Sequence, residues 1–294
     1  MNAWQLHRVV SDIDHTLKSD NRPWLTPPVP GMVELMCDLR QLIPSLQRQD
    51  TIRTMSVEVS CCGKRNDSED EAVACSAAPF VYLTNRYGPV SSITRGRWCP
   101  GTFLKINGFP DHDQLVQRKW TDAVGFLRRS PQHKLDVLQR LLSDGPRHHG
   151  QVVVLLGDSV EKDALIFTQH AFVELERRDC ERIPTPQTKD LLASTTLPSS
   201  SCTYVLGIRL VRSHPISPEC LEAHAMFSRK AAERFGLGCD PSPLNEAPLS
   251  DIDSWLHSSP VEVQTSGGAI WFTFTDGEQL REKLSRLFPI KRQQ

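Results

Sequence analysis

The sequence predicts an α/β fold in which a mainly parallel sheet carries helices on both faces. Short apolar runs recur along the chain, and the clearest of them, residues 152–156, contains no polar side chain. Such a run is typical of a parallel strand that is buried on both faces. Segments with apolar residues at helical spacing separate these runs. This alternation of strand and helix patterns indicates β-α-β units with right-handed crossovers.

The first part of the chain is predicted to hold two strands with a helix between them. Residues 6–13 and 80–83 are short apolar runs with the length of strands. Between them, apolar residues recur at helical spacing from residue 31 to residue 43, and Pro44 is expected to end that helix. Residues from about 50 to 78 are polar and charged without any period, which predicts an exposed insertion.

The remaining elements follow at shorter intervals. In order along the chain, we expect a strand at 101–106, helices at 113–129 and 133–142, a strand at 152–156 that ends at Gly157, a helix at 160–170, a strand at 204–211, a helix at 218–235, a strand at 269–274 and a helix at 278–287. Residues 1–212 are therefore expected to form a core, and residues 213–294 an extension that packs on this core or completes it.

Composition narrows the class of protein. The formal net charge is −1, so the chain has no net positive potential that would attract a polyanion, and no nucleic-acid partner is expected. No segment has the apolar length of a membrane span, and the first residues lack a secretory pattern. We therefore expect a cytoplasmic protein, with peripheral contact with membranes as an option. The nine cysteines form no C-x-x-C pair, which favours reduced thiols over a zinc site.

Polar side chains gather where three of the predicted strands end. Asp12 and Asp14 follow the first run, Thr84 follows the second, and Asp158 follows the run at 152–156. The carboxyl ends of parallel strands meet at one edge of a sheet, and binding sites form in the crevice there. These four side chains are therefore expected to surround one site.

The residue types predict phosphoryl transfer. Asp12 could attack phosphorus as a nucleophile, while Asp14 protonates the leaving oxygen and later activates water. Carboxylates this close together require a cation, and Asp12, Asp158 and the backbone carbonyl of Asp14 offer the hard oxygen ligands that Mg²⁺ prefers. Thr84 could donate to a phosphate oxygen, and Lys134 could supply positive charge to the transferring group.

The order of these motifs resembles that of the haloacid dehalogenase (HAD) superfamily of phosphatases. The matching residues are Asp12-Ile13-Asp14-His15-Thr16, Thr84, Lys134, and Gly157-Asp158 with Asp163. The segments SDIDHTLKSD, FVYLTNR, GTFLKI, HKLDVLQRLL, VVVLLGDSVEKDALIF and GIRLV are similar, in this order, to the catalytic domain of the actin-patch type of phosphatidate phosphatases. The similarity covers roughly residues 8–212.

The resemblance implies a HAD-like three-layer sandwich with residues 1–212 as the catalytic core. The intervals 16–80 and 84–134 are too short for a full cap domain. The resemblance further implies an Mg²⁺-dependent phosphatidate phosphatase that works through an aspartyl-phosphate. Its phosphorylated substrate would be a membrane lipid, which the protein approaches peripherally. The substrate-binding residues would be Thr84, Asn85, Arg86 and Lys134, and the supporting residues Thr16 and Asp163. A phosphatase for a sugar phosphate, nucleotide or phosphoprotein, and a catalytically silent scaffold, are the alternatives.

Some residues near the motifs depart from the family pattern. His15 stands where the family usually has an aspartate, and it is either a modulator of Asp14 or an ordinary loop histidine. Val160 and Ala164 replace a glycine and a proline in the acidic motif. Asp163 is expected to support Lys134 or a metal-bound water rather than bind metal directly, and Glu161 is expected to be solvated.

Overall fold

The structure is a computed structural model that describes residues 5–19, 26–43, 79–87, 100–118, 132–142, 151–181, 203–235 and 269–290. Its elements follow one another as β1 (Gln5–Asp12), α1 (Met32–Leu42), β2 (Phe80–Tyr87), α5 (Pro100–Ile106), β3 (Gln114–Arg118), α6 (Gln132–Leu142), β4 (Gln151–Asp158), α7 (Asp163–Glu181), β5 (Thr203–Arg209), α8 (Pro218–Phe235), β6 (Ala269–Phe274) and α10 (Gly277–Ser285). The insertion predicted at about 50–78 lies outside the described residues.

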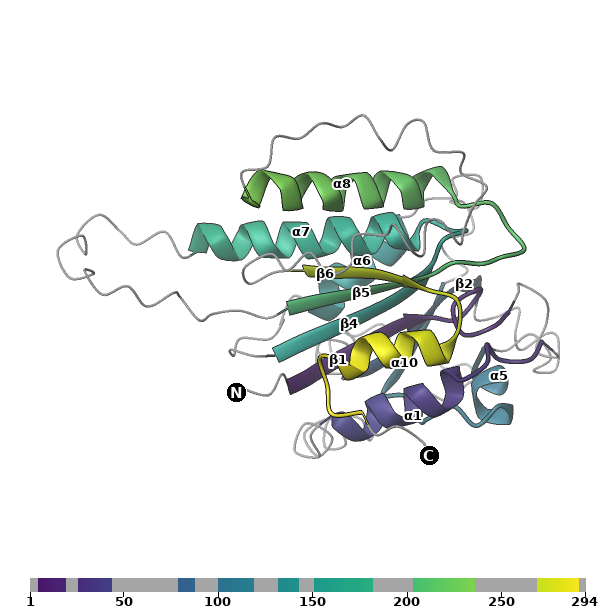
Figure 1. Cartoon of the computed structure of the whole chain (residues 1–294). Helices are drawn as coiled ribbons and strands as arrows, with labels where there is room; N and C mark the ends of the chain where they lie inside the picture. Colours follow the sequence, from purple (N-terminus) through teal and green to yellow (C-terminus); the bar gives the residue numbers. More distant parts are fainter. Residues whose placement is uncertain are drawn as a thin grey trace, which may run out of the picture.

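One sheet organises the fold (Figure 1). Its six described strands are all parallel and lie in the order β3-β2-β1-β4-β5-β6. The chain thus builds outward from β1 in one direction and then from β4 in the other. In a doubly wound sheet of this order, the crevice for a ligand opens where the direction reverses, at the carboxyl ends of β1 and β4.

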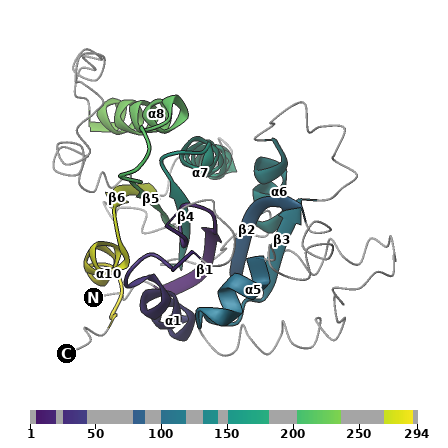
Figure 2. The same ribbon diagram turned by 90° about the vertical axis from the view of Figure 1, so that its right-hand side faces the viewer.

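Helices cover both faces of the sheet (Figure 2). Along each strand, successive side chains point to opposite faces. In β4, Val153 and Leu155 pack with α6, α7 and α8, whereas Val152 and Val154 pack with α1, α5 and α10. Every residue of β4 is buried, as expected for a central strand between two helical layers. The chain is therefore a three-layer α/β/α sandwich.

Two predicted elements are wrong. Residues 101–106 belong to a helix, α5, and not to a strand. Its buried residues Pro100, Phe103 and Leu104 recur at helical spacing, Pro100 suits the first helical position, and Gly108 adopts a positive φ just after the helix. Such a short apolar run does not by itself distinguish a helix from a strand.

The second error concerns the helix predicted at 113–129. Gln114–Arg118 is instead β3, which among the described strands lies at the edge of the sheet and pairs with β2 only. Residues 119–129 lie outside the described residues. Gln114, Leu115 and Val116 are each only partly buried. An edge strand of this kind lacks the continuous apolar run by which central strands are recognised.

The other predicted elements that fall in the described part are confirmed, with shifted ends. β4 runs through Gly157 to Asp158, and α7 begins at Asp163 rather than at residue 160. Beyond residue 212, β6 pairs with β5, and the N–H of Gly277 at the start of α10 donates to the carbonyl of Pro30 just before α1 (2.8 Å). A boundary at residue 212 stays a prediction, but the sheet continues across it.

Candidate active site

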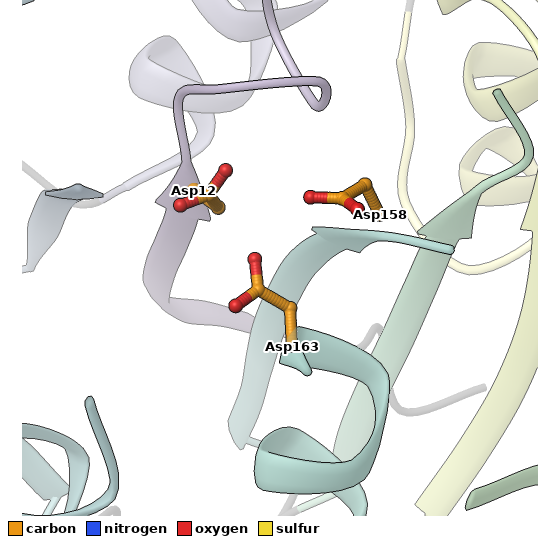
Figure 3. Close-up of side chains that lie close together, drawn as sticks. All are labelled: Asp12, Asp158 and Asp163. Carbon is orange, nitrogen blue, oxygen red and sulfur yellow. The ribbon is translucent and has the colours of Figure 1, made fainter. Parts of the chain in front are cut away.

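Three aspartates converge at the reversal point of the sheet (Figure 3). Asp12 is the last residue of β1, Asp158 is the last residue of β4, and Asp163 is the first residue of α7. β1 and β4 are hydrogen-bonded neighbours, so their last residues lie side by side. Each of the three side chains is at most 1% exposed.

The three carboxylates form a site that fits a divalent cation. One oxygen from each lies within 4.8 Å of the others. Within the described residues, Oδ2 of Asp12, of Asp158 and of Asp163 is buried without a hydrogen-bond partner. The amides of Val160 and Glu161 donate to Oδ1 of Asp158 (2.7 and 2.8 Å), which fixes the orientation of that carboxylate. Hard, negatively charged oxygens are the ligands that Mg²⁺ and similar cations prefer.

Lys134 on α6 is the positive charge of this cluster. Its Nζ lies 2.8 Å from Oδ1 of Asp12, 2.5 Å from Oδ1 of Asp163 and 3.6 Å from Oε2 of Glu161. Burial lowers the pKa of Lys134. The neighbouring carboxylates raise it by more than burial lowers it, so the pKa of Lys134 stands well above its ordinary value. Glu161, which we expected to be solvated, has a side chain only 26% exposed and belongs to the cluster.

Negative charge is in excess around Lys134. Burial raises the pKa of Asp12 and of Asp158 well above the ordinary value, and the neighbouring carboxylates of Asp163 and Glu161 raise both further. Burial likewise raises the pKa of Asp163, although Lys134 opposes this shift. Four carboxylates that share one ammonium are unfavourable, and a bound divalent cation would offset their repulsion.

Asp14 has different partners. Its Oδ1 accepts from Nζ of Lys18 (3.1 Å) and its Oδ2 accepts from the hydroxyl of Thr84 (3.2 Å). All three side chains are buried. The hydroxyl that we expected to bind phosphate therefore contacts the candidate acid–base residue. Asp14 thus contacts Lys18 and Thr84, whereas Asp12 contacts Lys134, although only two residues separate them along the chain.

The loop after β1 positions Asp14. The amides of Leu17 and Lys18 both donate to the carbonyl of Ile13 (3.0 and 3.1 Å), which closes a tight turn. His15 has a φ of 58° within this turn, and its ring meets that of His214 edge to face at 4.9 Å. Burial lowers the pKa of His15. Thr16, expected to support the site, is fully buried in the same turn.

Two functional candidates escaped sequence reasoning, namely Lys18 and Arg209. Lys18 follows Asp14 by four residues, and this spacing is a usable signal for an ion pair. Arg209 is the last residue of β5, so the rule that found Asp12 and Asp158 also applies to it. The remaining candidates, Asn85 and Arg86, belong to β2, but their side chains lie outside the described residues.

The fold and this cluster define an α/β protein with a candidate cation site at the reversal point of a parallel sheet. No match was found among protein-family models, curated proteins or solved structures. Among the described helices, none has both the length and the apolar character needed to cross a membrane.

Proposed function

We propose that this chain is a HAD-like phosphatase without a full cap domain, which hydrolyses a phosphomonoester in the presence of Mg²⁺ with Asp12 as the covalent nucleophile. The observation that carries the proposal is the separation of two carboxylates only two residues apart. Asp12 lies against Lys134 and faces Asp158 and Asp163, whereas Asp14 lies between Lys18 and Thr84. Covalent phosphoryl transfer uses a nucleophile and a separate acid–base group, and two neighbouring carboxylates with different partners can take these two roles.

In the first step, a carboxylate oxygen of Asp12 attacks phosphorus and the bond from phosphorus to the ester oxygen breaks. The leaving oxygen takes a proton from Asp14, so the products of this step are an aspartyl-phosphate and a neutral alcohol. The ammonium of Lys134, 2.8 Å from Asp12, offsets negative charge on the transferring group.

In the second step, water attacks the phosphorus of the aspartyl-phosphate. Asp14 accepts a proton from this water, the bond from phosphorus to Asp12 breaks, and inorganic phosphate leaves. Asp12, Asp158 and Asp163 would hold the metal ion, with Asp163 as a ligand or as the support of Lys134 that we expected. A bound Mg²⁺ supplies positive charge that favours the ionised nucleophile and neutralises the phosphate.

Phosphatidate is the first substrate to test, because the motif order resembles that of the actin-patch type of phosphatidate phosphatases. Phosphate release should be measured from phosphatidate in mixed micelles, sugar phosphates, nucleotides, a phosphopeptide and an aryl phosphate, with Mg²⁺ and with chelator. We expect Mg²⁺-dependent release that is greatest with phosphatidate. Release that is greatest with a soluble ester would retain the mechanism and replace the lipid substrate.

The matched variants are Asp12→Asn and Asp113→Asn, because Asp113 is a largely buried aspartate that pairs with Arg40 outside the cluster. We expect turnover to disappear in the first and to persist in the second. Activity retained by Asp12→Asn would overturn the nucleophile assignment. A folded protein that binds Mg²⁺ but releases phosphate from no ester would replace the proposal with a silent scaffold.

A further inference from the structure

Arg209 joins three segments of the chain beside the candidate site. It ends β5 and is 9% exposed. Its Nη1 donates to the carbonyl of His15 and to the carbonyl of Lys18 (3.0 Å), and its Nε donates to the carbonyl of Thr275 (3.1 Å). One guanidinium thus connects the loop after β1 with the turn between β6 and α10.

A buried charge at this position has a cost that the contacts must offset. Burial lowers the pKa of Arg209 to about 10, while the carboxylates of Asp158 and Asp276 oppose this shift, so the guanidinium remains charged at neutral pH. An apolar side chain of similar length would pack without this desolvation. The planar fork of an arginine spreads its donors over separate nitrogens, so it can donate to carbonyls of different segments at once, which indicates that the donors are what this position requires.

The carbonyls that Arg209 binds belong to the residue that follows Asp14 and to the lysine that contacts its carboxylate. His15 directly follows Asp14 and has the left-handed backbone conformation, which is uncommon for a residue with a side chain. Lys18 carries the ammonium that contacts Oδ1 of Asp14. Holding both carbonyls therefore fixes the peptide between His15 and Thr16, one residue beyond Asp14, and the backbone of Lys18, the ion-pair partner of Asp14.

We propose that Arg209 is a positioning residue for Asp14, which it places for proton transfer to the leaving oxygen by holding the backbone of the loop after β1. This inference rests on the proposed function. It also makes the chain after residue 212 part of the site, because Thr275 shares the same guanidinium.

The test compares two aryl esters that differ in their need for a proton. The nitro group of 4-nitrophenyl phosphate stabilises the departing phenolate, whereas phenyl phosphate depends more strongly on a general acid. Because general acid catalysis contributes about 100-fold or more, we expect Arg209→Met to lose at least about tenfold more kcat/KM on phenyl phosphate than on 4-nitrophenyl phosphate. Arg209→Lys should show a smaller but measurable difference, because an ammonium retains the charge and some donors but does not reproduce the fork.

Two controls separate positioning from general damage. Asp14→Asn should show the same dependence on the leaving group, and adding Arg209→Met to it should change the ratio by less than about twofold, because the two residues act as one unit. Arg281→Met removes another buried arginine, which contacts Asp38 across α1 and α10. It should lower the melting temperature and leave the ratio of the two esters unchanged.

Amide hydrogen exchange provides a readout that needs no turnover. Arg209→Met should speed exchange at Leu17 and Lys18, whose amides close the loop, and leave exchange unchanged at Phe109, whose amide donates to Leu104 (3.0 Å) away from the site. Unchanged exchange at Leu17 and Lys18, or equal loss on both esters, overturns the positioning role while the proposed function stands. A wild-type protein that hydrolyses no phosphomonoester with Mg²⁺ overturns the proposed function, and the positioning role with it.

Discussion

The two ends of the parallel sheet both hold buried charge, but in different proportions. Near the amino end of β2, Arg40 on α1 meets Asp113 in a two-point contact of 2.5 and 2.8 Å. Asp113 also accepts from the amide of Phe80, the first residue of β2 (2.8 Å). At the carboxyl ends of β1 and β4, the carboxylates of Asp12, Glu161 and Asp163 surround the ammonium of Lys134.

This difference in charge balance distinguishes a structural ion pair at the amino end of the sheet from a candidate binding site at its carboxyl end. In the contact of Arg40 with Asp113 each charge has a partner, and the pair fastens α1 to the start of β2. The cluster around Lys134 has more negative charge than it can neutralise and retains buried oxygens without a partner among the described residues. Such a surplus lowers stability and persists where a ligand requires it. Four predictions can sharpen or break this contrast.

The largest effect is expected from Asp12→Asn. It should lower kcat by at least about a thousandfold, because the covalent step loses its nucleophile. In chelator, the same change should raise the free energy of unfolding by about 1 kcal/mol, because one of the crowded carboxylates is neutralised. Turnover assays and urea denaturation test the two halves. A variant that loses stability in chelator would show that the charges at this end are balanced after all.

Asp113→Asn should lower the free energy of unfolding and leave kcat almost unchanged. Losing one partner of a largely buried ion pair costs about 3 kcal/mol of unfolding free energy, whereas kcat should stay within about twofold of wild type. Urea denaturation with the same turnover assay measures both. A strong loss of kcat in a folded Asp113→Asn protein would place function at the amino end too, and the contrast would fail.

Mg²⁺ should stabilise the protein only by binding at the carboxyl ends of β1 and β4. At a hundred times its dissociation constant, a ligand that binds only the folded state adds about 2.7 kcal/mol to the free energy of unfolding. We expect this shift in calorimetry for wild type and for Asp113→Asn, and its loss in Asp158→Asn, which removes an oxygen donor. An equal shift in all three proteins would mean that the cation binds elsewhere.

His224 on α8 shows what burial does to the pKa of a histidine. Burial lowers its pKa from 6.5 to about 4. As pH falls from 7 to 5, the unfolded chain takes up a proton at this histidine that the folded chain refuses. The free energy of unfolding should therefore fall by about 2 kcal/mol over this range. His224→Leu should reduce the change in unfolding free energy between pH 7 and pH 5, measured by urea denaturation at both pH values. The same change in wild type and in the variant would contradict the assignment.

The sequence predicted the centre of the site better than its surroundings. Asp12 and Asp158 could be found because each ends an apolar run, and two central strands of a doubly wound sheet bring their ends together. Arg209 binds the carbonyl of Lys18, 191 residues away, and such a contact depends on the pairing of the strands and not on any local pattern. The edge strand β3 and the short helix α5 were misassigned because neither carries a periodic pattern long enough to decide.

The starts of α1 and α10 touch through glycine. A side chain at Gly277 would overlap the backbone of Gly31, so the two backbones meet directly. During synthesis, β1 and residue 31 are made before the segment that packs against them, because Gly277 follows Gly31 by 246 residues. The loop that holds Asp14 cannot acquire its contact through Arg209 to Thr275 before then. The nascent chain therefore carries its acidic motif until residues 275–277 have been made, before the site can assemble.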